Sequence, residues 1–271
     1  MAVGTFPTEC SKNKPGNIDM HYASDNPLSG QTVLVTGAAR RIGAAICETL
    51  HAAGMNVAIH YRNSSIKADQ LAARLNADRD GSAKAFRANL IEAGEPADLV
   101  REVTVWADGL DALVNNASTF YPTPLANVDE MAWNDLVGSN LKAPLFLAQS
   151  AAPHLRKSGG SIVNIVDIHA KRPLRDHHVY GAAKAGLAML TQSLARDLAP
   201  QVRVNGISPG AITWPENGMS DDVKQPILNQ VPLGRSGDPI DIAGAVLFFI
   251  RDATYATGQI IAIDGGRSIG W

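Results

Sequence analysis

The chain has 271 residues, of which 45% are hydrophobic and 18% are charged, and its formal net charge is −2. This is the composition of an ordinary globular protein with enough chain for one full core. The near-neutral charge gives no support for a nucleic-acid or membrane partner, and no apolar run in the sequence reaches transmembrane length.

The first 29 residues contain no apolar stretch of the kind that a secretory signal has, and they are rich in Pro, Asn, Ser and Gly. We therefore expect residues 1–29 to form a flexible N-terminal extension and residues 30–271 to form a single domain. Cys10 lies in the extension, and Cys47 occupies a position typical of a core residue. These two cysteines indicate no disulfide framework, which fits a cytoplasmic protein.

Strand-like and helix-like segments alternate along the rest of the chain. Short apolar runs predict strands near 32–36, 56–60, 83–87, 111–115, 161–166, 202–207 and 259–263. Helices are expected near 42–53, 65–77, 95–107, 129–139, 141–157, 177–198 and 238–251. This alternation predicts an α/β fold: a Rossmann-like doubly wound, seven-stranded parallel sheet with helices on both faces. A stretch broken by Pro and Gly, at about 211–237, is expected to form a partly helical flap over the carboxyl edge of the sheet.

The first predicted strand runs directly into a glycine turn, in the segment TVLVTGAARRIG. Gly37 opens the turn, and Gly43 falls inside the helix that follows. Free backbone N–H groups and the helix dipole at such a turn favour a phosphate group. The alternative is an ordinary strand-to-helix turn that binds nothing.

The end of the second predicted strand indicates which dinucleotide such a turn would hold. An NAD-specific fold needs an acidic residue here for the ribose 2′-hydroxyl, but the segment His60-Tyr61-Arg62-Asn63-Ser64 contains none. Arg62 offers a planar cation suited to a 2′-phosphate, and Arg41 supplies a second cation from the turn. We therefore expect NADP(H), with a solvated turn as the alternative for Arg41 and its neighbour Arg40.

Farther along the chain, Asp167 follows a predicted buried strand, and Tyr180 and Lys184 follow it four residues apart on a predicted helix. Residues with this spacing lie on one helix face. A neighbouring ammonium is expected to lower the pKa of the phenol, so that Tyr180 exchanges a proton near neutral pH. The alternatives are a chance pairing of Tyr and Lys, and a purely structural Asp167 that caps the strand end.

Together these segments resemble the short-chain dehydrogenase/reductase family from Gln31 to Arg267. The resemblance rests on TGAARRIG, LVNNAS, Asn140, the YGAAK segment, VRVNGISPGAI and IIAIDGG, in that order. Within the family the chain is most similar to pteridine reductases. Arg41 replaces a usual glycine, NNASTFYPTPL replaces the common NNAG, and Asp167 replaces the usual catalytic serine.

The resemblance implies a set of site residues. The catalytic residues are Asn140, Asp167, Tyr180 and Lys184. The cofactor residues are Gly37, Arg41, Ile42, Gly43, His60, Tyr61, Arg62, Asn63, Ser64, Asn89, Leu90, Asn116, Ala117, Ser118, Tyr180, Lys184, Pro209, Gly210 and Ile212. The substrate residues are Ser118, Phe120, Asp167, Tyr180 and Trp214. No metal site is expected.

Two of these implied roles have alternatives, and a third residue, Asn89, departs from the family pattern. Asn140 is a proton-relay residue by resemblance, but a buried Asn also satisfies local backbone groups. Phe120 is a stacking platform for a pterin by resemblance, but it is otherwise a plain core aromatic. Asn89 replaces the family's usual Asp at the adenine edge, where its side-chain carbonyl can accept from the adenine amine.

Asp167 indicates the substrate, because a carboxylate only accepts hydrogen bonds and would repel a developing alkoxide. It suits a substrate with N–H donors, or a ring nitrogen that must gain a proton. The resemblance therefore implies an NADPH-dependent pteridine reductase that converts dihydropterin to tetrahydropterin. The alternatives are a carbonyl reductase, such as a 3-oxoacyl thioester reductase, and a catalytically idle NADP-binding regulator. The family also implies a homotetramer in which the apolar C-terminus packs near a neighbouring subunit's site.

Overall fold

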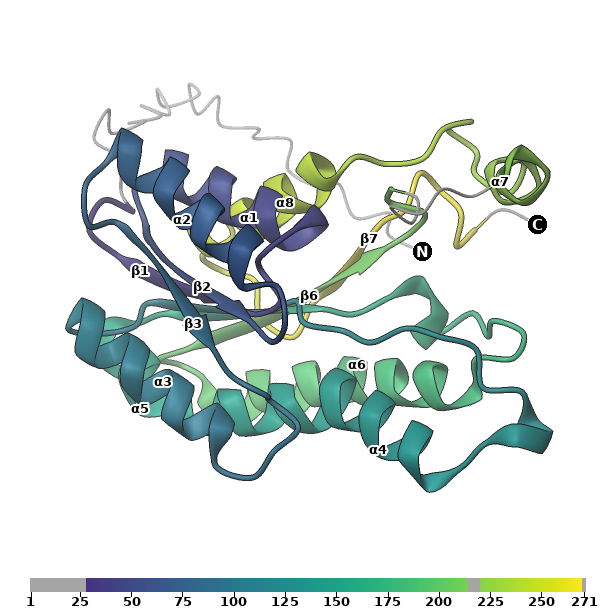
Figure 1. Cartoon of the computed structure of the whole chain (residues 1–271), viewed down its shortest axis with the longest axis horizontal. Coiled ribbons are helices and arrows are strands. Elements are labelled where there is room, and N and C mark those ends of the chain that lie inside the picture. The colour runs from purple at the N-terminus through teal and green to yellow at the C-terminus, as the bar shows by residue number, and fades with distance from the viewer. Residues whose placement is uncertain (1–27, 214–219, 270–271) are drawn as a thin grey trace, which may run out of the picture.

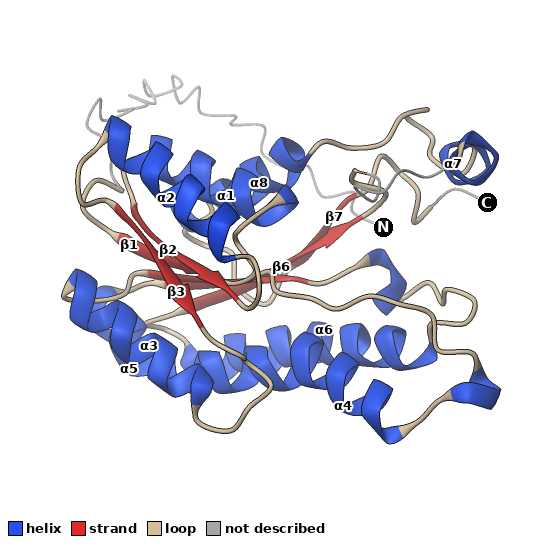
Figure 2. Cartoon of the chain, in the orientation of Figure 1, coloured by secondary structure: helices blue, strands red, loops and turns tan. Residues whose placement is uncertain are grey.

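The computed structural model describes residues 28–213 and 220–269 of the chain. Seven parallel strands form one sheet in the order β3-β2-β1-β4-β5-β6-β7. Helices α1, α2 and α8 cover one face of this sheet, and α3, α5 and α6 cover the other (Figures 1 and 2). The predicted Rossmann-like doubly wound fold is thereby confirmed.

The strands are β1 (Thr32–Val35), β2 (Asn56–Tyr61), β3 (Ala83–Arg87), β4 (Ala112–Asn115), β5 (Ser161–Ile165), β6 (Arg203–Pro209) and β7 (Ile260–Ile263). The α-helices are α1 (Arg41–Ala52), α2 (Ser65–Asp78), α3 (Glu95–Ala107), α4 (Glu130–Val137), α5 (Ala143–Ser158), α6 (His178–Leu198), α7 (Asp221–Leu228) and α8 (Pro239–Leu247). No helix among these described residues is long and apolar enough to cross a membrane.

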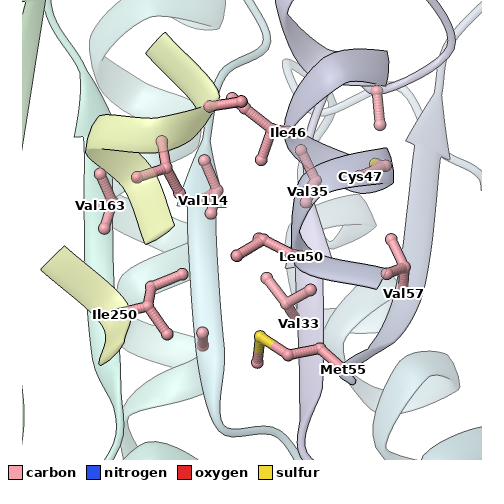
Figure 3. Close-up of a cluster of buried hydrophobic side chains, with 14 of the residues drawn as sticks. Val33, Val35, Ile46, Cys47, Leu50, Met55, Val57, Val114, Val163 and Ile250 are labelled. Carbon is pink, nitrogen blue, oxygen red and sulfur yellow. The ribbon is translucent and has the colours of Figure 1, made fainter. Parts of the chain in front are cut away.

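The sheet forms because its central strands are apolar on both faces. Every residue of β1 is buried. Val33 and Val35 pack into the core beneath α1 and α8 (Figure 3), whereas Leu34 packs into the core beneath α3 and α5. This alternation follows from the two-residue period of a strand, and it explains why β1 reads as a continuous apolar run. Cys47 lies in the first of these cores, as the sequence predicts, and is fully buried.

The predicted strands and helices all form, and the differences lie at their ends. The helix predicted over 129–139 stops at Val137, and a π-helical turn, Gly138–Lys142, connects α4 to α5. A second π-helical turn, Phe248–Asp252, ends the last predicted helix. In both places the backbone stays helical but changes its hydrogen-bond period, which residue periodicity does not reveal.

Some predictions concern residues that lie outside the described part of the chain. These are the extension up to residue 27, Trp214 in the flap and the terminal Trp271. Within the flap, α7 spans Asp221–Leu228, so the segment is partly helical there. The homotetramer stays a prediction, which a measurement of the molecular mass in solution by light scattering will test. The side chains of Leu145 and Phe146 on α5 are apolar and exposed on the single chain, as residues of a subunit interface would be.

Candidate active site

A cavity of about 590 Å³ opens at the carboxyl edge of the sheet. It lies where the strand order reverses, because β1 has β2 on one side and β4 on the other. Helices diverge on opposite faces at such a point and leave a crevice that parallel α/β folds use for ligands.

The cavity collects nearly all the residues that the sequence proposes for the site. Its lining includes Gly37, Arg41, Ile42, Gly43, His60, Tyr61, Arg62, Asn63, Ser64, Asn89, Leu90, Asn116, Ala117, Ser118, Phe120, Asp167, Tyr180, Lys184, Pro209, Gly210 and Ile212. Asn140 does not line the cavity: its side chain is fully buried, and its neighbour Ser139 lines the cavity instead. These residues come from segments far apart in the sequence, and the parallel sheet brings them to one edge.

Two glycines of the turn after β1 allow a close packing that other residues would prevent. Gly37 has φ +60°, and a Cβ there would lie 2.8 Å from the Ala117 Cα atom. A Cβ on Gly43 would lie 2.8 Å from the Ala38 Cα atom and 2.7 Å from the Asn116 side-chain nitrogen. That nitrogen donates to the carbonyls of Thr36 (2.8 Å) and Gly37 (3.1 Å). The turn is therefore held rigidly at the N-terminus of α1, where backbone N–H groups favour a phosphate.

A helical glycine outside the site provides a matched comparison for Gly43. Gly43→Ala is expected to destabilise the protein by about 1–3 kcal/mol, because the added methyl group overpacks the turn. Gly244→Ala in α8 meets nothing within 4 Å, so it is expected to stabilise the helix by about 0.5–1 kcal/mol. Urea unfolding of both variants measures the difference, and equal free energies of unfolding would contradict this account of the turn.

Asn89 also lines the cavity, and its side chain has a polar atom with no hydrogen-bond partner. Its side-chain nitrogen donates to Glu92 (3.2 Å), and its backbone N–H donates to Glu95 (3.2 Å). Its side-chain oxygen is buried and accepts no hydrogen bond. Such an oxygen is costly unless a donor reaches it. An amine at the edge of an adenine ring is a donor of the required kind, so the residues present fit a dinucleotide.

Both proposed cations reach the cavity, and both have weak partners. Arg62 forms an ion pair with Asp135 at 3.6 Å, and both side chains are partly exposed. The Arg41 guanidinium donates to the Thr213 hydroxyl at 3.2 Å. Partly exposed pairs such as Arg62–Asp135 contribute little stability, so a phosphate can replace them at low cost. Arg41 has φ +53°, a left-handed conformation that favours glycine and that is costly for other residues.

The carboxylate of Asp167 accepts two hydrogen bonds. One of its oxygens accepts from the Tyr180 hydroxyl at 2.6 Å. The other accepts from the backbone N–H of His169 at 2.8 Å and so caps the short 3₁₀ turn Ile168–Ala170. The two interpretations of Asp167 are therefore compatible, since one oxygen serves as a cap while the other contacts Tyr180.

The predicted lowering of the Tyr180 pKa is wrong. Burial raises the pKa of Tyr180 well above its usual value, and the adjacent Asp167 carboxylate raises it further. Lys184 is on the same helix face, but its ammonium lies 5.8 Å from the Tyr180 ring centre and donates to the Ile165 carbonyl at 2.9 Å. A negative charge in direct contact outweighs this more distant positive one. Tyr180 therefore holds its proton at neutral pH, and its role as a proton donor stays a prediction.

Lys184 itself is almost completely buried. Burial lowers its pKa from 10.5 to about 8, although the Asp167 carboxylate opposes that shift. Tyr180 and Lys184 are thus both buried beside the partly exposed Asp167 carboxylate.

The Asn140 side chain is fully buried in the π-helical turn and is committed to hydrogen bonds. Its amide nitrogen donates to the carbonyls of Thr119 and Leu136, both at 2.9 Å. Its oxygen accepts from the Ser118 hydroxyl at 2.7 Å. The side chain therefore holds the Ser118–Thr119 segment in place, which is the structural alternative for Asn140. Its role in proton relay stays a prediction.

Phe120 is not a core residue, because 55% of its surface is exposed. Its ring stacks on His177, with ring centres 4.6 Å apart, and meets the Tyr180 ring edge-on at 4.8 Å. An exposed aromatic face at the mouth of a cavity, next to the Tyr180 hydroxyl, suits a flat ring as a ligand.

Sequence patterns assign no role to Arg267, which also lines the cavity. Burial lowers the pKa of its guanidinium, and the carboxylates of Asp167 and Asp264 oppose this shift. Asp264 fixes the turn that carries Arg267 by accepting from the backbone N–H groups of Gly266 (2.9 Å) and Ser268 (2.7 Å). The sequence could have indicated this place for Arg267, because Arg267 follows the last strand and the carboxyl ends of all the strands meet at this edge of the sheet.

A doubly wound sheet, a glycine turn beneath one cavity and a buried Tyr–Lys pair in the same cavity define a nicotinamide-dependent oxidoreductase. The family model described as enoyl-(acyl carrier protein) reductase matches residues 37–268. The chain belongs to the short-chain dehydrogenase/reductase family.

The similar proteins carry two kinds of name. Pteridine reductase 1 of Leishmania tarentolae is 38% identical over 277 aligned residues, which cover 87% of this chain and 96% of that protein. The 3-oxoacyl-(acyl-carrier-protein) reductase FabG of Staphylococcus epidermidis is 36% identical over 240 residues, with 87% and 98% covered. The 3-oxoacyl-(acyl-carrier-protein) reductase of Synechocystis is 36% identical over 245 residues, with 88% and 97% covered. Identity alone does not separate a pterin substrate from an acyl thioester.

Proposed function

We propose that this protein is an NADPH-dependent pteridine reductase, which reduces a dihydropterin to a tetrahydropterin. The observation that carries the proposal is the hydrogen bond from the Tyr180 hydroxyl to the Asp167 carboxylate, 2.6 Å long, inside the cavity. A carbonyl reductase is expected to have a hydroxyl donor at the position of Asp167, and this chain has an acceptor there.

The chemistry of the substrate explains this preference. A carbonyl oxygen becomes negatively charged as hydride reaches its carbon, and a carboxylate beside it would oppose that change. A pterin instead presents an amino group and ring N–H groups, which donate to a carboxylate. Reduction of its C=N bond also requires a proton on nitrogen, and Tyr180 holds a proton in direct contact with Asp167.

The cofactor supplies the hydride when it is bound, and the protein binds and orients it. The turn from Gly37 to Gly43 suits its diphosphate, and the unpaired Asn89 oxygen suits its adenine. Arg62 and Arg41, with no acidic residue at the end of β2, favour a 2′-phosphate. These features support NADPH rather than NADH.

Replacement of Arg62 tests the choice of cofactor. Arg62→Ala is expected to raise the Michaelis constant for NADPH roughly tenfold or more, because a charge-assisted phosphate contact is worth about 1.5–3 kcal/mol. The constant for NADH should barely change. Arg101→Ala, on the exposed face of α3 and paired with Asp98 at 2.6 Å, is the matched control. A wild-type preference for NADH would show that the assignment of Arg62 is wrong.

A second candidate, reduction of a 3-oxoacyl thioester, is favoured by the similarity to the FabG proteins over the same part of the chain. Oxidation of NADPH with a dihydropterin and with an acetoacetyl thioester, assayed side by side, distinguishes the two. Turnover of the dihydropterin alone supports our proposal, and turnover of the thioester alone contradicts it. NADPH binding without turnover of either would indicate a catalytically idle regulator.

A further inference from the structure

His60, at the end of β2, is almost completely buried and makes hydrogen bonds in two directions. Its Nδ1 atom accepts from the backbone N–H of Gly37 at 3.1 Å, and its carbonyl accepts from the N–H of Ala38 at 2.8 Å. Its Nε2 atom lies 3.1 Å from the carbonyl oxygen of Ala88. The residue therefore contacts both the glycine turn and the end of β3.

These contacts determine the protonation state of the imidazole. The Gly37 N–H is a donor, so Nδ1 must be an unprotonated acceptor, and the Ala88 carbonyl is an acceptor, so Nε2 must carry the proton. Burial lowers the pKa of His60 to about 4, with the nearby Arg62 cation adding to the shift and the Ala88 bond opposing it. At neutral pH the side chain is thus neutral, with one fixed tautomer.

The two segments that His60 joins both contribute to the lining of the cavity. Gly37 and Ala38 begin the turn proposed for the diphosphate, and Ala88 directly precedes Asn89, whose unpaired oxygen is proposed for the adenine. The Gly37 N–H already donates to His60, so a phosphate would accept hydrogen bonds from the N–H groups farther along the turn. Because both ring nitrogens of His60 are bonded to the backbone, His60 can line the cavity without a polar contact to the cofactor.

We propose that His60 is a positioning residue that holds the turn proposed for the diphosphate at a fixed distance from the segment proposed for the adenine. The inference rests on the proposed use of NADPH. It adds a role for His60, whose ring nitrogens are bonded to the protein rather than free for the cofactor. Its loss would leave the partly buried Gly37 N–H without its acceptor and would free the turn to move.

Two substitutions distinguish the hydrogen-bonding role of His60 from a role in packing alone. His60→Asn keeps a carbonyl oxygen near the position of Nδ1, so it can still accept from Gly37. His60→Leu keeps the volume but no acceptor. The dissociation constant for NADPH, measured by calorimetry, is expected to rise roughly tenfold or more in His60→Leu, which loses both bonds. In His60→Asn, which loses only the bond to Ala88, it is expected to rise by a smaller factor, about threefold. The Michaelis constant for NADPH should rise more than the turnover number falls.

His51→Leu is the matched control, because His51 is also buried but contacts the Ser82 hydroxyl at 2.7 Å and does not line the cavity. It is expected to lower the melting temperature without weakening NADPH binding. Equal weakening in His60→Asn and His60→Leu would overturn the inference. Failure of the wild type to bind NADPH would overturn the proposed function instead.

A measurement on the wild-type protein covers the case in which the variants do not fold. The ¹⁵N chemical shifts of His60 in the uniformly labelled protein are expected to show a protonated Nε2 and an unprotonated, hydrogen-bonded Nδ1 between about pH 6 and 8. A protonated Nδ1 in that range would contradict the bond to Gly37 and with it the proposed role.

Discussion

Tyr180→Phe is expected to lower the turnover number for dihydropterin reduction roughly 100-fold or more while NADPH binding is retained. The substitution removes the only hydroxyl in contact with the Asp167 carboxylate among the described side chains, and it keeps the ring that packs edge-on against Phe120. Because burial and Asp167 raise the pKa of Tyr180, the hydroxyl carries its proton throughout the neutral range. Loss of that donor should therefore affect the chemical step rather than binding.

The neighbouring tyrosine provides the control. Tyr121→Phe makes the same chemical change next to Phe120, but Tyr121 does not line the cavity and its hydroxyl interacts with Asp135 instead. Its turnover is expected to stay close to that of wild type. Single-turnover measurements at saturating NADPH separate chemistry from product release. Full activity in Tyr180→Phe would remove the proposed mechanism.

Asp167→Asn is expected to lower dihydropterin turnover by a similar factor, roughly 100-fold. Asn keeps the size of Asp and an oxygen that can cap the 3₁₀ turn through the N–H of His169, so the local structure should persist. It carries no negative charge and delivers no acidic proton, so any loss of turnover reports on the carboxylate itself. Thermal unfolding of the variant checks that the fold is intact.

Asp167→Ser gives the second part of this test. It is expected to lose dihydropterin reduction, because a shorter and uncharged hydroxyl replaces the carboxylate that accepts from the pterin N–H groups. It also replaces a negative charge by a hydroxyl donor, so weak reduction of activated ketones is expected to appear. Dihydropterin turnover equal to wild type in both Asp167→Asn and Asp167→Ser would leave Asp167 as a cap of the 3₁₀ turn. That result would strengthen the 3-oxoacyl thioester alternative.

Local patterns in the sequence predict the fold and also most of the residues that line the cavity. The strands are short runs of apolar and β-branched residues, and β1 and β5 are buried along their whole length. A parallel sheet covered on both faces is the arrangement that buries such runs. Because parallel strands end at one edge, the amino-acid sequence alone assigns the segments after β1, β2, β4 and β5 to one cavity.

What each of these residues does depends on the tertiary structure. The separation of Tyr180 and Lys184 along a helix predicts contact, but the pKa of Tyr180 depends on burial and on which charge lies nearer. The nearer charge is that of Asp167, which accepts the 2.6 Å hydrogen bond from a position 13 residues away in the sequence. Likewise the pattern places Asn140 on a helix, and only the π-helical turn shows that its side chain holds Ser118 and Thr119.

The same reason explains the residues whose roles the sequence does not reveal. Arg267 reaches the cavity because it follows the carboxyl end of β7, and Asp135 meets Arg62 although 73 positions separate them in the chain. His60 is a polar residue in an apolar run, and nothing in that run shows that its ring bonds to Gly37 on one side and Ala88 on the other. Hydrogen bonds and charges act over a few ångströms in space, so their partners become known only when the fold has brought distant segments together.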